Sequence, residues 1–107
     1  MYTQQIFGPI MPVLRYTSLD AVVSRINANE KPLSLYVFAN DSKVSERLLT
    51  RTTSGHAVVN DILLQFSAPL PFGGVGNSGM GSYHGKWSFD TFSHEKGVLK
   101  RHGAEKC

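Results

Sequence analysis

The sequence has a single cysteine and no long apolar run. Cys107 is the last of the 107 residues, so the chain has no internal disulfide, and we expect a cytoplasmic, reducing location. A thiol at a mobile, solvated chain end is also a poor nucleophile. No stretch approaches the roughly 20 apolar residues that span a bilayer. No basic segment followed by an apolar one opens the chain, so we expect neither a membrane helix nor a secretory signal.

The sequence also lacks a large excess of either positive or negative charge. The chain has 11 basic and 8 acidic residues, for a net charge of +3, and no block of like charge. This pattern predicts no nucleic-acid partner. The four histidines lack the spacing of metal ligands, so no metal site is expected. The serines lack the glycine-flanked turn that carries a hydrolase nucleophile.

The spacing of the apolar residues predicts alternating strands and helices. Apolar side chains at Leu19, Val22, Val23 and Ile26 lie on one face of a helix. The almost continuously apolar segment 33–39 is typical of a strand buried on both faces. In order, the sequence predicts a strand over 10–16, a helix from Ser18 to about Asn29, a strand over 33–39, a helix from Ser42 that stops before Ser54-Gly55, and a strand over 57–60.

A helix joins each pair of successive strands in this order. Such crossovers connect parallel neighbours, so the predicted class is α/β with a parallel sheet. Sheets of this kind bind ligands beyond the carboxyl ends of their strands. A site is therefore expected in the loops that follow Ala39 and Asn60.

Residues 67–85 form a segment rich in proline and glycine, which predicts a long ordered loop with a function. Within it, residues 74–79 match G-x-G-x-x-G, the pattern of a dinucleotide pyrophosphate site. That interpretation is disfavoured, because the motif follows Pro69-Leu-Pro71 and not a buried strand, and Gly81 stands where a helix should continue. The glycines more plausibly let backbone pass close to other backbone or to a ligand. A short helix over 87–92 and a last strand over 97–101 should follow.

Four segments together resemble the aldehyde dehydrogenases. Gln5-Ile-Phe-Gly-Pro-Ile10 is similar to that superfamily's E-I-F-G-P segment. Residues 70–86, LPFGGVGNSGMGSYHGK, resemble its glycine-rich loop, and most closely that of the class 3 branch of fatty and medium-chain enzymes. Residues 30–39 and 88–94 also fit this branch. The resemblance covers residues 4–102.

This resemblance implies a C-terminal portion of an aldehyde dehydrogenase catalytic domain. Residues 1–94 would be part of that domain, with three strands and a substrate-tunnel loop over 67–85, and residues 95–107 a bridging strand and a frayed tail. The family oxidises aldehydes to carboxylic acids with NAD or NADP, and the complete enzyme would be a homodimer. Its nucleophilic cysteine, general-base glutamate, oxyanion asparagine and dinucleotide-binding domain have no match here. The resemblance therefore implies no catalytic residue in this chain, and no activity for the chain alone.

Several side chains carry over from the family by position. Phe7 matches the phenylalanine beside the nicotinamide, and Gln5 replaces the glutamate that holds the ribose hydroxyls. An amide has one acceptor oxygen where a carboxylate has two, so we expect weaker cofactor binding. His56 replaces a glycine and would be strained if that position needs a positive φ. Asn60 and Asp61 match a pair that braces the active-site floor. The residues that match the lining of the aldehyde tunnel are Leu63, Phe66, Ser67, Phe72 and His84.

Two other functions remain open from the sequence. The chain could be a truncated interaction module that pairs with intact aldehyde dehydrogenase subunits through an exposed sheet edge. It could also be a free-standing nucleotide-binding protein, which would require that the chain binds NAD by itself.

Overall fold

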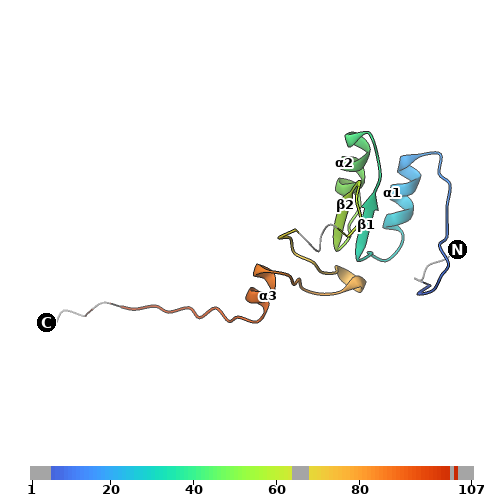
Figure 1. Ribbon diagram of the computed structural model, residues 1–107. Helices are drawn as coiled ribbons and strands as arrows, with labels where there is room; N and C mark the ends of the chain where they lie inside the picture. Colours follow the sequence, from blue (N-terminus) through green and yellow to red (C-terminus); the bar gives the residue numbers. More distant parts are fainter. Residues whose placement is uncertain (1–5, 64–67, 102, 104–107) are drawn as a thin grey trace.

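The computed structural model describes residues 6–63, 68–101 and 103. Its elements run along the chain as helix, strand, helix and strand, followed by a one-turn helix and a short helix (Figure 1). They are α1 (Leu19–Asn27), β1 (Ser34–Val37), α2 (Ser42–Arg51), β2 (His56–Val59), the 3₁₀ turn η2 (Gly76–Ser78) and α3 (Lys86–Thr91).

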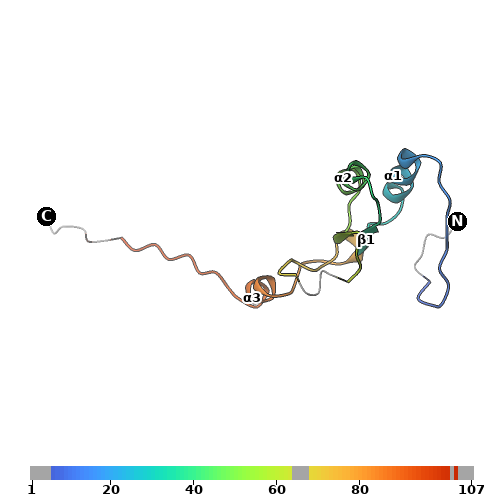
Figure 2. The same cartoon turned by 45° about the horizontal axis from the view of Figure 1, so that its top comes forward.

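The sheet formed by β1 and β2 is parallel, as the sequence predicts. Its register runs from Ser34 opposite His56 to Val37 opposite Val59, with α2 as the crossover. Figures 1 and 2 show α1 and α2 beside one another next to the strands. An ion pair between Arg47 of α2 and Asp20 of α1 joins the two helices.

Local signals account for the bounds of both helices. Ser18 occupies the N-cap position of α1 with an extended φ of −140°, although its side chain makes no capping hydrogen bond. At the other end, the Asn29 side chain donates to the Arg25 carbonyl at 2.7 Å. The Asp41 carboxylate caps α2 by accepting from the Lys43 backbone N–H at 2.9 Å. Polar side chains thus satisfy backbone groups at the C-terminal end of α1 and at the N-terminal end of α2.

The core of the described chain is small. Val23, Val37 and Val58 are its buried apolar residues. An apolar hollow of about 240 Å³ lies where α1, β1 and α2 meet, lined in part by Ile26 and Leu48. The prediction that residues 33–39 are buried on both faces is wrong. Val37 is 4% exposed but Phe38 is 67% exposed, because the described elements leave that side chain open to solvent.

Two predicted strands are not strands in the structure. Residues 10–16 and 97–101 carry no strand assignment, and the two-stranded sheet of the described residues includes neither. Their apolar side chains stand in solvent, with Met11 83% and Leu99 98% exposed. The segment that follows α3, up to residue 101, extends away from the other elements in Figure 1. A β-prone sequence needs a neighbouring strand to complete its hydrogen-bond ladder, and neither segment has one among the described residues.

The glycine-rich loop folds back on itself. Phe72 and Tyr83 form an antiparallel bridge, in which the Phe72 N–H donates at 3.1 Å and the Tyr83 N–H donates at 2.9 Å. The G-x-G-x-x-G stretch contributes only the turn η2 and then leaves it at Gly79, with φ 144°. No α-helix begins at this stretch, whereas a dinucleotide-binding motif would be followed by one.

The loop also packs directly on the start of β2. A Cβ atom added to Gly55 would lie 2.2 Å from the Gly73 carbonyl oxygen and 2.7 Å from that of Leu33. A Cβ atom on Gly73 would lie 2.1 Å from the Gly81 carbonyl oxygen. Within residues 74–79, a Cβ atom on Gly74 would lie 2.1 Å from the Ser78 carbonyl oxygen, which confirms the expected close approach of backbone to backbone there.

Substitution of Gly55 tests this packing. In Gly55→Ala, the added methyl group meets rigid backbone, so we expect the free energy of unfolding to fall by about 1–3 kcal/mol. Urea denaturation followed by circular dichroism measures the change. Gly97→Ala is the matched control, because a Cβ atom there meets nothing within 4 Å. Equal stabilities for the two variants would contradict the described packing.

Candidate functional site

Asn60 ties together the carboxyl ends of both strands. Its side-chain oxygen accepts from the Ala39 N–H at 2.8 Å, and its side-chain nitrogen donates to the Ala39 carbonyl at 3.0 Å. Its own N–H donates to the Val37 carbonyl at 2.8 Å. Asn60 adopts a φ of 57°, a conformation that asparagine tolerates better than most residues. The two loops in which a site was expected are therefore joined by one side chain.

A row of aromatic rings runs from the sheet into the glycine-rich loop. His56 lies 6.4 Å from Tyr36 and 4.6 Å from Phe72, measured between ring centroids. Phe72 meets Tyr83 edge-on at 5.5 Å, and Tyr83 meets His84 edge-on at 6.5 Å. Offset and edge-on ring pairs are the favoured arrangements of aromatic side chains. The row brings together two residues predicted to line the tunnel, Phe72 and His84.

His56 joins this row to the sheet through a hydrogen bond. Its Nε2 shares a hydrogen bond of 2.9 Å with the Ser34 hydroxyl across the sheet. Its Nδ1 is shielded from solvent and has no hydrogen-bond partner. Desolvation by burial lowers the pKa of His56 from its usual 6.5, which favours the neutral ring. The strain considered for His56 is not found, because this residue lies in β2 and outside the positive-φ residues.

Three predicted site residues do have a positive φ. Phe7 adopts 51°, Leu63 adopts 59° and His84 adopts 89°. Bulky residues rarely enter this region, at a cost of about 1–3 kcal/mol each, and such backbone is enriched at functional sites. This backbone conformation was not predictable, because these residues are not glycines.

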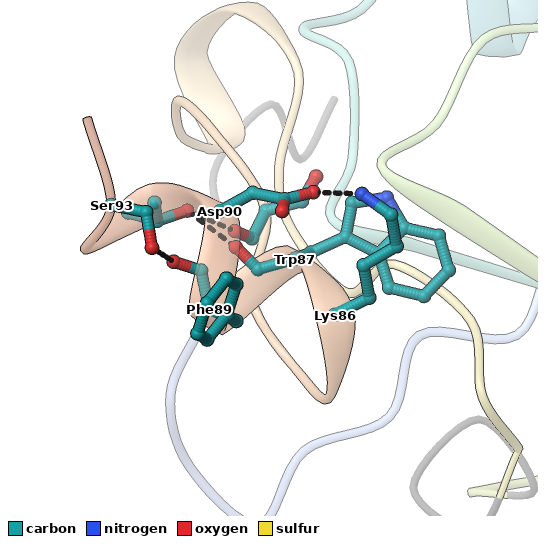
Figure 3. Close-up of polar contacts among 7 residues, drawn as sticks. Lys86, Trp87, Phe89, Asp90 and Ser93 are labelled. Carbon is teal, nitrogen blue, oxygen red and sulfur yellow. Dashed lines mark hydrogen bonds and ion pairs between the residues drawn. The ribbon is translucent and has the colours of Figure 1, made fainter. Parts of the chain in front are cut away.

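His84 is held at the start of α3. Its N–H donates to the Ser88 hydroxyl at 2.7 Å, and its carbonyl accepts from the Trp87 N–H at 3.2 Å. Figure 3 shows contacts local to this helix, with Lys86 paired to Asp90 and the Ser93 hydroxyl donating to the Phe89 carbonyl at 2.6 Å. The helix predicted over 87–92 is thus confirmed, one residue shifted, and its first turn orients His84.

The remaining predicted residues are not gathered at one place. Gln5, Phe66 and Ser67 lie outside the described residues. Phe7 is 88% and Leu63 57% exposed. The segment before α1, blue in Figures 1 and 2, runs on the α1 side and away from the glycine-rich loop. The structure therefore brings Phe72 and His84 together around Tyr83, and Phe7 lies apart from them.

A hollow that the sequence did not predict lies beside the glycine-rich loop. It has a volume of about 740 Å³ and lies between the approach to β1 and the turn η2, lined in part by Lys31, Tyr36 and Asn77. Neither Phe72 nor His84 lines it.

Among the described residues, no cluster of three acidic, histidine or cysteine side chains could hold a metal ion. No helix in the described ranges is long and apolar enough to cross a membrane.

Comparison with known proteins places this arrangement in a family. The aldehyde dehydrogenase family model matches residues 1–98. The mouse "aldehyde dehydrogenase, dimeric NADP-preferring" is 52% identical over 99 residues, which are 92% of this chain and 22% of that protein. Human aldehyde dehydrogenase family 3 member B1 is 54% identical, over 92% of this chain and 21% of its own length.

A solved structure agrees with these sequence matches. The substrate-bound state of Staphylococcus aureus AldH superimposes with a TM-score of 0.87 at 48% identity, covering 97% of this chain and 23% of that one. The chain spans about a fifth of the length of the curated relatives it matches. The identity and the coverage of this chain show that it belongs to the aldehyde dehydrogenase family.

Proposed function

We propose that the chain forms part of an NAD(P)-dependent aldehyde dehydrogenase, which oxidises aldehydes to carboxylic acids. The observation that carries this proposal is the match of almost the whole chain to a substrate-bound AldH at 48% identity. In this proposal the chain supplies part of the aldehyde channel and part of the nicotinamide side.

The aldehyde side is formed by the glycine-rich loop and its neighbours. Phe72 is half-buried, and the bridge to Tyr83 fixes its backbone. With Leu63, Phe66, Ser67 and His84, it would give a largely apolar channel. Such a channel suits a hydrophobic aldehyde and keeps bulk water from the reacting carbon.

The cofactor side would be formed by Phe7 and Gln5. The Phe7 side chain is 88% exposed, so its ring is available to a planar group, and this fits a nicotinamide neighbour. When bound, the nicotinamide accepts the hydride that the aldehyde loses. Phe7 would limit where the nicotinamide ring lies, and hydride transfer requires close approach and good orientation. Gln5 would hold the ribose through one carbonyl oxygen.

We infer that these residues do not complete an active site by themselves. The only cysteine of the chain is Cys107, and no segment of the resemblance carries the family's nucleophile. The reactive half would belong to the regions of the relatives that this chain does not match. The printed name of the mouse relative calls that protein dimeric and NADP-preferring, and we propose a homodimer for the complete enzyme here.

A hybrid enzyme tests the proposed function. The chain replaces the matched 99 residues of the mouse relative, and oxidation of aldehydes is followed by the absorbance of reduced cofactor. We expect activity from the hybrid and none from the 107-residue chain alone, because only the hybrid has both halves of the site. In a control hybrid, Phe72→Asp places a charge in the channel and should lower activity for apolar aldehydes about 100-fold or more.

A soluble, folded hybrid that forms no reduced cofactor would contradict the proposed function. Turnover of aldehydes by the 107-residue chain alone would contradict the inferred division of the site.

Gln5 offers a test of the cofactor side. In the hybrid, Gln5→Glu restores a second acceptor oxygen for the ribose hydroxyls, so the cofactor KM should fall by roughly tenfold, the effect of one charge-assisted hydrogen bond. The aldehyde KM should stay constant and serves as the internal control. An unchanged cofactor KM would count against a ribose contact at this position.

A further inference from the structure

His56 lies where β1, β2 and the glycine-rich loop meet. It is the first residue of β2 and lies opposite Ser34 in the register of the sheet. Its Nε2 is 2.9 Å from the Ser34 hydroxyl oxygen, and its ring centroid is 4.6 Å from that of Phe72, with the planes inclined by 37°. The imidazole is therefore fixed on its sheet side and presents its ring to the loop.

The neighbouring residue strengthens this junction. Gly55 touches the backbone of Gly73, so two consecutive residues at the start of β2 meet two consecutive residues of the loop. Within the loop, Tyr83 holds Phe72 by two backbone hydrogen bonds and by an edge-on contact between the two rings. These hydrogen bonds hold the Phe72 backbone, and the His56 ring contacts the Phe72 ring from the side of β2.

We propose that His56 is a positioning residue that fixes the orientation of the Phe72 ring and so selects the aldehydes that the channel admits. This inference rests on the proposed function, because it assigns Phe72 to the channel wall. A change in the orientation of the Phe72 ring would change the width of an apolar channel, and an aldehyde with a long chain would be affected more than a short one.

The environment of His56 favours the neutral imidazole in this contact. Burial lowers the pKa of His56 from 6.5. The groups that face its ring in the described contacts are the Ser34 hydroxyl and the Tyr36 ring from β1, and the Phe72 ring from the loop. None of the three provides a negative charge at neutral pH to compensate a proton on the imidazole. Protonation of the imidazole should therefore weaken its contact with Phe72.

The sign of the pH effect follows from this lowered pKa. Between the pKa of the folded chain and 6.5, the unfolded chain binds the proton and the folded chain does not. The stabilisation by neutral His56 is therefore complete above pH 6.5 and decreases as the pH falls toward the folded pKa. Orientation of Phe72 should be lost as the pH falls through the folded pKa itself.

The test uses two substitutions in the hybrid enzyme. His56→Gln keeps a group that can bond to Ser34 but removes the ring, whereas His56→Phe keeps a ring that cannot be protonated. The readout is the ratio of kcat/KM for a long-chain and a short-chain aliphatic aldehyde, measured across the acid range. His94→Gln is the matched control, because His94 is exposed and lies outside the site.

In His56→Gln, the ratio should fall roughly threefold to tenfold, mainly through the KM of the long aldehyde, which is the range expected for one lost aromatic contact. His56→Phe should restore the ratio and make it independent of pH, whereas the unsubstituted hybrid should lose selectivity on acidification. His94→Gln should match the unsubstituted hybrid. An active hybrid whose ratio is unaffected by His56→Gln would overturn the positioning role while leaving the proposed function intact.

An inactive hybrid would contradict the proposed function, and the 107-residue chain then tests the contact directly. Nuclear Overhauser effects between the ring protons of His56 and Phe72 should be present at neutral pH and disappear on acidification. Their absence at neutral pH would overturn the inference.

Discussion

The close approach of the glycine-rich loop to the start of β2 is the contact on which the candidate site depends. A side chain on Gly55 would overlap the Gly73 carbonyl oxygen at 2.2 Å, so the two backbones can meet only because residue 55 is glycine. This contact brings Phe72 against His56 and, through the bridge to Tyr83, places His84 at the start of α3. The sheet contributes a fixed edge, and the loop contributes the side chains.

Features determined by neighbours in sequence were predictable. The spacing of Leu19, Val22 and Ile26, the cap at Asp41 and the helical crossover gave both helices and the parallel strand pair. The strands predicted over 10–16 and 97–101 failed because a strand depends on a partner, and a single sequence does not show where that partner is. The same limit explains the exposed Phe38.

Part of the candidate site could be predicted, and the prediction came more from the resemblance to the aldehyde dehydrogenases than from the physical chemistry of the residues. The resemblance predicts Phe72 and His84 as channel residues, and in the structure both rings contact Tyr83. The contacts of His56 with Ser34 and Phe72 were not predicted, because the sequence indicated only that His56 replaces a glycine. One signal was available: a parallel register that pairs the first residues of both strands places His56 beside Ser34. The positive φ of Phe7 and Leu63 had no signal in the sequence.

The exposed apolar surface agrees with a role inside a larger enzyme. The radius of gyration is 21.0 Å, against about 13 Å for a compact domain of 100 residues. Apolar side chains such as Met11 and Leu99 are almost fully exposed, and burying them elsewhere would stabilise both partners. A crystal structure of the hybrid enzyme with NADP and an aldehyde analogue tests this account most directly. We expect the Phe7 ring beside the nicotinamide and the Phe72 ring on the wall of the same cavity; Phe7 and Phe72 facing separate cavities would contradict it.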